Sequence, residues 1–168
     1  MITSLFRIML AVAVVHTSLA ISTETQASES MTNVAHQEIV RAGSQPSVAG
    51  SDEYFVGQVR VQPVWPADAS INASGGLVTF EAGARSAWHT HPAGQRLVVT
   101  SGSGLTQEWG KEIKRIRAGD VVWCPPGVKH WHGAAPNSAM THLAVTGTVN
   151  GKNVSWMEKV TDEQYKSH

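Results

Sequence analysis

The chain is poor in cysteine, in net charge and in long apolar runs, and each shortage excludes a class of protein. Cys124 is the only cysteine among 168 residues, so no disulfide can form within the chain. Lys and Arg number 13, as do Asp and Glu, which gives a formal net charge of zero and argues against a nucleic-acid binder. The apolar run at residues 8–15 is shorter than the roughly 20 residues of a membrane-spanning helix.

The N-terminal residues have the pattern of a secretory signal peptide. Arg7 supplies a basic region, residues 8–15 supply a short apolar core, and small residues follow up to Ala20 and Ala27. We expect a signal peptide over residues 1–27, cleaved after Ala20 or Ala27, and therefore an exported protein, periplasmic or secreted. The alternative is a membrane anchor, which the short apolar run disfavours. Once the leader is removed, we expect no membrane contact.

The rest of the chain is long enough for one domain with a hydrophobic core. Residues 28–50 are rich in small and polar side chains and predict a linker and edge segment, and residues 51–168 predict one barrel domain. Short apolar stretches separated by Gly, Pro and Asn predict an all-β fold of antiparallel strands. The expected strands are 38–41, 55–62, 77–80, 84–91, 96–100, 105–109, 112–116, 121–124, 130–132, 140–145 and 154–157.

Two further local signals mark the ends of elements. Residues 101–104, Ser-Gly-Ser-Gly, predict a turn between two strands, and Pro63 is expected to end the strand that begins at Phe55. Only Thr161–Tyr165 has a helical signature, with Thr161 as the N-cap and Gln164 three residues later.

Histidine is abundant and clustered, which points to a metal site. Five of the eight histidines fall between His89 and His142. His89 and His91 are two residues apart, so on a strand both imidazoles face the same side. A turn at Pro92–Gly94 brings Gln95 back beside them, and His130 is the best candidate for a fourth ligand. The alternative is a strand that merely buries polar groups.

At this point the residues resemble two known motifs. The spacing of Gly83, His89-x-His91, Gln95 and Gly102 resembles the first cupin motif, and that of Gly119, Pro125-x-Gly127 and His130 resembles the second. The chain departs from the pattern at Gln95, where Glu is usual, and at Ala134, where Asn is usual. The resemblance implies a single small antiparallel β-barrel of the jelly-roll type with a metal inside.

A closer resemblance covers nearly all of residues 55–165. Residues 83–92, 129–136 and 160–165 are similar to the bacterial cupin hydroxynitrile lyases, which are manganese-dependent and cleave or form cyanohydrins. This resemblance implies metal ligands at His89, His91, Gln95 and His130, and a base at His142. The positions implied to line the pocket are Gly76, Val78, Ser86 and Thr146.

The chemistry of these residue types agrees with such a reaction. Three imidazoles and one amide oxygen suit a divalent first-row metal and accept manganese, iron, zinc or nickel; the resemblance implies manganese. Gln95 cancels none of the metal's charge, whereas Glu would, so the site favours a reaction that forms an oxyanion. His142 shares a strand face with Ala144 and Thr146 and is suited to act as a general base. The alternative is a hydrogen-bonded core histidine.

The neighbours of the ligands have less specific roles. His132 lies two residues past His130 and is a fifth ligand, a residue that orients a ligand, or an interface residue; we favour the second. Trp88 and Trp131 are expected in packing or subunit contact, and Arg85 and Lys129 are expected to be solvated charges.

The functional hypothesis is a metal-dependent cyanohydrin lyase acting on a small-molecule substrate. The competing hypotheses are an iron-dependent cupin dioxygenase and a non-catalytic cupin that binds a metal or a small molecule. Because cupins commonly pair, we expect a homo-oligomer, either a dimer or a tetramer.

Overall fold

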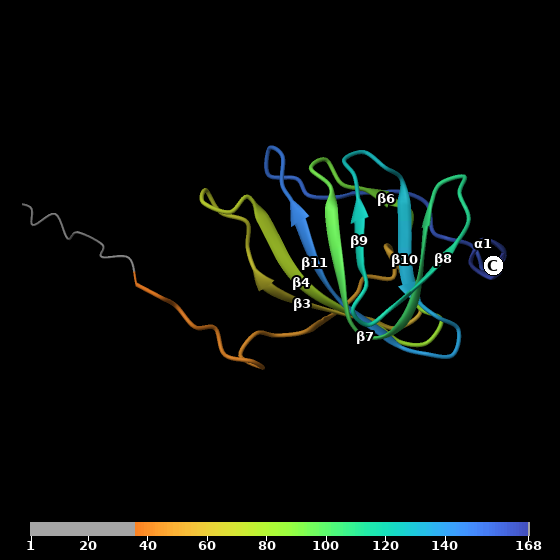
Figure 1. Cartoon of the computed structure of the whole chain (residues 1–168), viewed down its shortest axis with the longest axis horizontal. Helices are drawn as coiled ribbons and strands as arrows, with labels where there is room; N and C mark the ends of the chain where they lie inside the picture. Colours follow the sequence, from red (N-terminus) through yellow and green to blue (C-terminus); the bar gives the residue numbers. More distant parts are fainter. Residues whose placement is uncertain (1–35, 168) are drawn as a thin grey trace, which may run out of the picture. The chain divides into compact units, whose positions relative to one another are not determined.

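A computed structural model describes residues 36–167, whose strands curl into an antiparallel barrel (Figure 1). The predicted signal peptide and residues 28–35 of the predicted linker lie outside the described residues. The strand order is β1-β3-β4-β11-β7-β10-β5-β2, with β6, β8, β9 and β12 paired off this path. The all-β prediction is therefore confirmed, and within 36–167 no helix is long and apolar enough to cross a membrane.

Within residues 36–167, four of the strands have seven or more residues, and the others have five or fewer. Their bounds are Val48–Ala49 (β1), Phe55–Val56 (β2), Val59–Trp65 (β3), Ala73–Phe80 (β4), Arg85–Ser86 (β5), His89–Thr90 (β6), Gln95–Glu108 (β7), Lys114–Arg117 (β8), Val121–Cys124 (β9), His130–Ala134 (β10), Met140–Gly147 (β11) and Ser155–Trp156 (β12). The helix α1, Asp162–Lys166, carries the capping box predicted from Thr161 and Gln164.

Strand β7 joins the two sides of the barrel, and here the predicted turn at residues 101–104 is wrong. The first part of β7 pairs with β9 and β11, and the part from Ser103 onward pairs with β8 and β10. Gly102, at φ 73°, lies where the partners change, and a Cβ there would meet the Ala139 carbonyl oxygen at 1.9 Å. Gly102 and Gly104 therefore let one continuous strand pass from one sheet to the other, and they do not form a turn between two strands.

Three other predicted boundaries also differ from the structure. Residues 38–41 form no strand and are exposed, and the edge strand is β1, which pairs with β3. Pro63 does not end β3, because a register shift between Pro63 and Trp65 accommodates the ring without breaking the sheet. The predicted strand 84–91 is divided into β5 and β6, which pair with different parts of β10.

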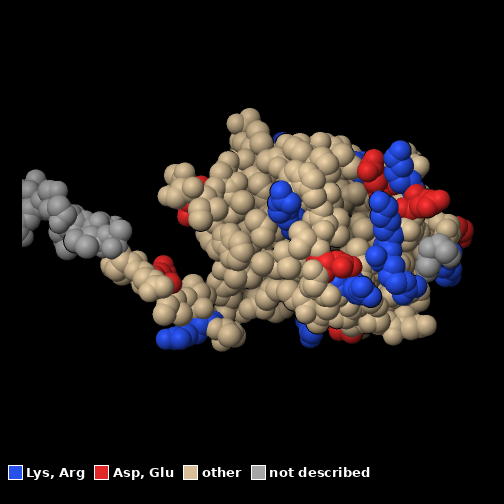
Figure 2. Space-filling view, in the orientation of Figure 1, with Lys and Arg blue, Asp and Glu red and all other residues tan. Residues whose placement is uncertain are grey.

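The barrel interior is apolar at one end and polar at the other. Alternate residues of β11 face inward, with Met140 in the apolar cluster and His142 and Thr146 further along. A second apolar cluster, Trp88, Leu105, Trp131, Val160 and Tyr165, packs α1 against the barrel, as expected for the two tryptophans. In the view of Figure 2, charges of both signs gather over the end with β8 and α1, whereas few lie over β3, β4 and β11.

Candidate metal centre

Strand pairing brings the predicted ligands together from three strands. His89 on β6 pairs directly with His130 on β10, so both side chains project from the same face of the ladder. His91 follows β6, and the turn through Gly94, at φ 79°, returns the chain so that Gln95 begins β7. Ring centroids are 4.3 Å apart for His89 and His130, and 5.0 Å apart for His89 and His91. All four side chains are buried.

Each imidazole is oriented by a backbone carbonyl. Nδ1 of His89 lies 2.9 Å from the carbonyl oxygen of Ala87, and Nδ1 of His130 lies 2.9 Å from that of Val128. Nδ1 of His91 lies 2.5 Å from the Asn153 carbonyl oxygen. Because a carbonyl only accepts, these contacts assign the proton to Nδ1 and leave the Nε2 lone pair free, as in histidines that bind metals.

Gln95 is oriented in the same way. Its Nε2 donates to Oγ1 of Thr146 at 3.0 Å, which directs Oε1 toward the histidines. Four buried side-chain atoms have no hydrogen-bond partner among the described residues: Nε2 of His91, Nε2 of His130, Oε1 of Gln95 and Nδ1 of His142. The first three belong to the predicted ligands. Buried acceptors without a partner are costly, and a cation would supply a partner to all three at once. This donor set fits a divalent metal.

His132 also lies beside the centre. Ring nitrogens of His89, His130 and His132 all lie within 4.8 Å of one another, a grouping that suits a metal ion. Nδ1 of His132 is 3.2 Å from Nε2 of His142, so these two rings form a hydrogen-bonded pair. His132 is therefore the link between the ligand cluster and the predicted base.

Burial keeps the histidines neutral. Desolvation lowers the pKa of both His130 and His142 to about 4, and it lowers the pKa of His89 and His132 well below its usual value. Repulsion between neighbouring imidazoles adds to this effect at His89 and His132. Burial also lowers the pKa of His91, against the opposing effect of its bond to Asn153. Neutral imidazoles are the form that ligates a metal.

A cavity of about 260 Å³ opens onto the cluster and has no charged side chain among its lining residues. They are Phe55, Val61, Val78, His89, His91, Gln95, His132, Thr146, Asn153, Val154 and Trp156. A second cavity, of about 420 Å³, shares Val61, Thr146 and Asn153 with the first and extends over Gly76 and Ala144. Because the two cavities share these three lining residues, they adjoin; we call the first, which the histidines line, the inner chamber and the second the outer chamber.

The remaining predicted residues occupy different places around this pocket. Val78 and Thr146 line the inner chamber, and Gly76 lines the outer one. Ser86 is fully buried, and its Oγ accepts from the backbone N–H of His132 at 3.2 Å, so it supports the wall from behind. His142 is fully buried and does not line the inner chamber. His132, to which it is hydrogen-bonded, does line it, so His142 lies behind His132.

Sequence reasoning missed two kinds of residue. Asn153 and Trp156 contribute a wall of the inner chamber from the C-terminal segment, and no spacing in the sequence ties them to the histidines. Arg85 was expected to be solvated, but it is only 5% exposed and bonded to that same segment. Lys129 was also expected to be solvated, but it pairs with Glu158 and lies 3.5 Å from the centroid of the Trp109 ring.

Comparison with known proteins shows the family to which the chain belongs. Residues 76–146 match the model of the cupin domain, and the chain belongs to the cupin family. It is 55% identical over 129 residues to the (R)-mandelonitrile lyase of Granulicella tundricola, a match that covers 77% of this chain and 98% of that protein.

Among solved structures, a cupin-like protein from Thermotoga maritima superposes with a TM-score of 0.67 at 40% identity, covering 77% of this chain and 96% of the other. A predicted oxalate decarboxylase from the same organism superposes with a TM-score of 0.60 at 22% identity, covering 67% of this chain and all of the other (100%), and shows the fold alone. The resemblance to cupins seen in the sequence is confirmed.

Proposed function

We propose that this chain is a metal-dependent lyase that cleaves or forms cyanohydrins. The observation that carries the proposal is a set of three buried atoms with free lone pairs and no hydrogen-bond partner, on His91, Gln95 and His130, beside a cavity lined by uncharged residues. The 55% identity to a protein named (R)-mandelonitrile lyase supports this choice among cupin activities.

The proposed ligands are His89, His91, Gln95 and His130, and the proposed metal is manganese, although iron, zinc and nickel accept the same donors. We favour His91 over His132 as the third imidazole, because Nε2 of His91 has no partner whereas His132 is engaged with His142. When bound, the metal supplies a Lewis acid beside the substrate oxygen. Gln95 is neutral, so the protein leaves the positive charge of that centre undiminished.

The proton of the cyanohydrin hydroxyl is taken by the His132–His142 pair in this proposal. If Nδ1 of His132 donates to Nε2 of His142, then Nε2 of His132 faces the inner chamber with a free lone pair. That atom accepts the hydroxyl proton, while the Nδ1 proton of His132 passes to Nε2 of His142, which is the final proton acceptor of the pair. The bond between the carbinol and nitrile carbons breaks, its electron pair leaves with cyanide, and a carbonyl forms.

The substrate is proposed to be a small uncharged molecule whose product is an aromatic or aliphatic aldehyde. Apolar side chains of Phe55, Val61, Val78 and Trp156 line the inner chamber together with the histidines. The outer chamber adds space over Gly76, where a Cβ would meet only the Gln62 carbonyl oxygen, at 3.8 Å. A substituent larger than a methyl group can therefore extend away from the metal ligands.

The test is mandelonitrile cleavage by the metal-stripped protein after reconstitution with manganese, iron or zinc in parallel. The proposal expects benzaldehyde release with manganese, and loss of that release in His142→Ala while metal content is retained. Tight metal binding without turnover by any of the three metals would refute it. Oxygen uptake by the iron form would instead identify a dioxygenase, and binding of ligands without any reaction would identify a non-catalytic cupin.

We also propose that the chain is exported and forms a homo-oligomer. Support for assembly comes from β9, where Val121 and Trp123 on the outer face of the barrel are 60% and 46% exposed. Apolar side chains exposed side by side on a sheet face favour contact with another protein surface. Mass spectrometry of the mature N-terminus and light scattering of the purified protein test the two points.

A further inference from the structure

The C-terminal segment, residues 153–166, runs from the cavity to the outside of the barrel. It begins with Asn153, whose carbonyl oxygen accepts from His91, and continues into β12, where Trp156 pairs with His89. The Trp156 ring lies 4.8 Å from the ring of His89 and stacks on Tyr54 at 4.9 Å. Trp156 therefore touches both a proposed metal ligand and the space for the substrate.

The strand that carries Trp156 is too short to hold itself in place. β12 has two residues, and its one partner among residues 36–167 is β6, which also has two. Beyond β12 the backbone makes two hydrogen bonds to Trp88. The Met157 N–H donates to the Trp88 carbonyl oxygen, and the Trp88 N–H donates to the Glu158 carbonyl oxygen, each at 2.9 Å. Two-residue pairings at a sheet edge open easily in water. The position of Trp156 consequently depends on what anchors the segment on either side.

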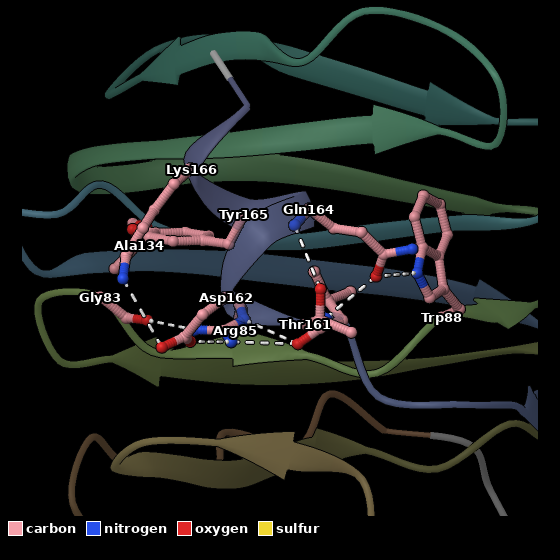
Figure 3. Close-up of polar contacts among 10 residues, drawn as sticks. Gly83, Arg85, Trp88, Ala134, Thr161, Asp162, Gln164, Tyr165 and Lys166 are labelled. Carbon is pink, nitrogen blue, oxygen red and sulfur yellow. Dashed lines mark hydrogen bonds and ion pairs between the residues drawn. The ribbon is translucent and has the colours of Figure 1, made fainter.

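Arg85 supplies the anchor on the C-terminal side (Figure 3). Its Nε and Nη2 both donate to the Val160 carbonyl oxygen, at 3.1 and 3.0 Å, and Nη2 also pairs with Asp162 at 2.7 Å. The guanidinium lies 4.8 Å from the centroid of the Tyr165 ring. Removing this buried cation would leave the Val160 carbonyl and the Asp162 carboxylate without their main partner.

The other contacts of the segment come from Lys129, which pairs with Glu158, and from helix α1. Helix α1 has five residues, and a helix that short has no stability of its own in water despite its capping box. It is held by packing and by two further bonds: Tyr165 Oη donates to the Ala134 carbonyl at 2.7 Å, and Trp88 Nε1 donates to Gln164 Oε1 at 3.3 Å. Arg85 is the charged group at the centre of these contacts.

We propose that Arg85 is a positioning residue that holds the C-terminal segment closed and thereby keeps Trp156 against His89 and the substrate. Its contribution is to substrate binding and not to the chemical step, because Trp156 forms a wall of the pocket and carries no group that moves a proton. The kinetic part of this inference rests on the proposed lyase function. The structural part does not, and it can be tested on the metal-free protein.

The structural test is hydrogen–deuterium exchange on the full chain. In Arg85→Gln we expect the peptide spanning residues 155–158 to exchange about tenfold faster, while peptides from β4 and β11 remain unchanged. Arg85→Lys should restore part of the protection, because an ammonium can reach one of the two partners. The matched control is Lys166→Gln, which removes only the exposed 3.6 Å pair with the other carboxylate oxygen of Asp162 and should leave exchange as in the wild type.

The kinetic test uses mandelonitrile cleavage by the manganese-loaded protein. We expect KM to rise about tenfold in Arg85→Gln, with kcat within about twofold of the wild type and metal content unchanged. Unchanged exchange at residues 155–158, or an equal rise across β4 and β11, would overturn the inference, as would a lowered kcat with KM unchanged.

Two further outcomes are kept distinct. If the wild type cleaves no cyanohydrin, the lyase proposal fails while the exchange measurement still decides the role of Arg85. If Arg85→Gln does not fold, Asp162→Asn and Tyr165→Phe, which weaken the same anchor from the other side, replace it. Both should then raise exchange at residues 155–158, and protection equal to the wild type in both would overturn the inference.

Discussion

Replacing Thr146 with valine tests how the unusual amide ligand is directed. Thr146 is 6% exposed, and its Oγ1 is the acceptor for Nε2 of Gln95 at 3.0 Å. Valine keeps the shape of threonine but removes the acceptor, so the buried Nε2 of Gln95 loses its partner. Leaving such a donor unpaired costs about 1–3 kcal/mol, and the amide escapes that cost only by rotating Oε1 away from the histidines.

The expected consequence is weaker metal binding with the fold intact. Loss of a residue that orients a metal ligand typically lowers affinity by about 10- to 100-fold, which is about 1.4–2.7 kcal/mol. The assay is manganese affinity by competition with a chelator. The control is Thr141→Val, which removes a hydroxyl pair with Thr79 at 3.0 Å on the outer face of the same strand. Equal affinities for Thr146→Val and wild type, or an equal loss in Thr141→Val, would refute the reasoning.

Three further predictions concern other parts of the site. His142→Ala should lower kcat by about 10²- to 10⁴-fold with metal content unchanged, as measured by benzaldehyde release and metal analysis. The metal-free protein should lose stability to urea as pH falls from 6.5 toward about 4. Folding lowers the pKa values of His130 and His142 from 6.5 to about 4, so in that range only the unfolded chain takes up these protons. A free energy of unfolding that does not change with pH would contradict this. Gly76→Leu should raise KM for bulky aromatic cyanohydrins more than for small aliphatic ones, since the added side chain enters the outer chamber, and equal changes for both would show that the substrate does not extend there.

Local spacing in the sequence was enough to predict a large part of the fold and of the proposed ligand set. The His89-x-His91 pair, the turn through Gly94 and the return at Gln95 are short-range features, so their geometry follows from strand periodicity and turn chemistry. The capping box at Thr161 is equally local, and the structure contains it. Strand β9 also has the predicted bounds, because Gly119 and Pro125 mark its two ends.

Where local signals compete with pairing, the sequence was misleading. The glycines at 102 and 104 indicate a turn by composition, yet β7 continues because both halves find partners in different sheets. Arg85 looks like a solvated charge within its own strand, and it is buried because a segment 75 residues later folds over it.

The sequence by itself determined which residue types are available to bind a metal and which of them lie within one turn of the chain. Only the tertiary structure decided that His130 faces His89, that His132 stands between His142 and the cavity, and that Trp156 and Asn153 complete the wall. The physical reason is that these relations depend on which strands pair and in what register. That choice is made by burial of the whole barrel and leaves no signal at any single position.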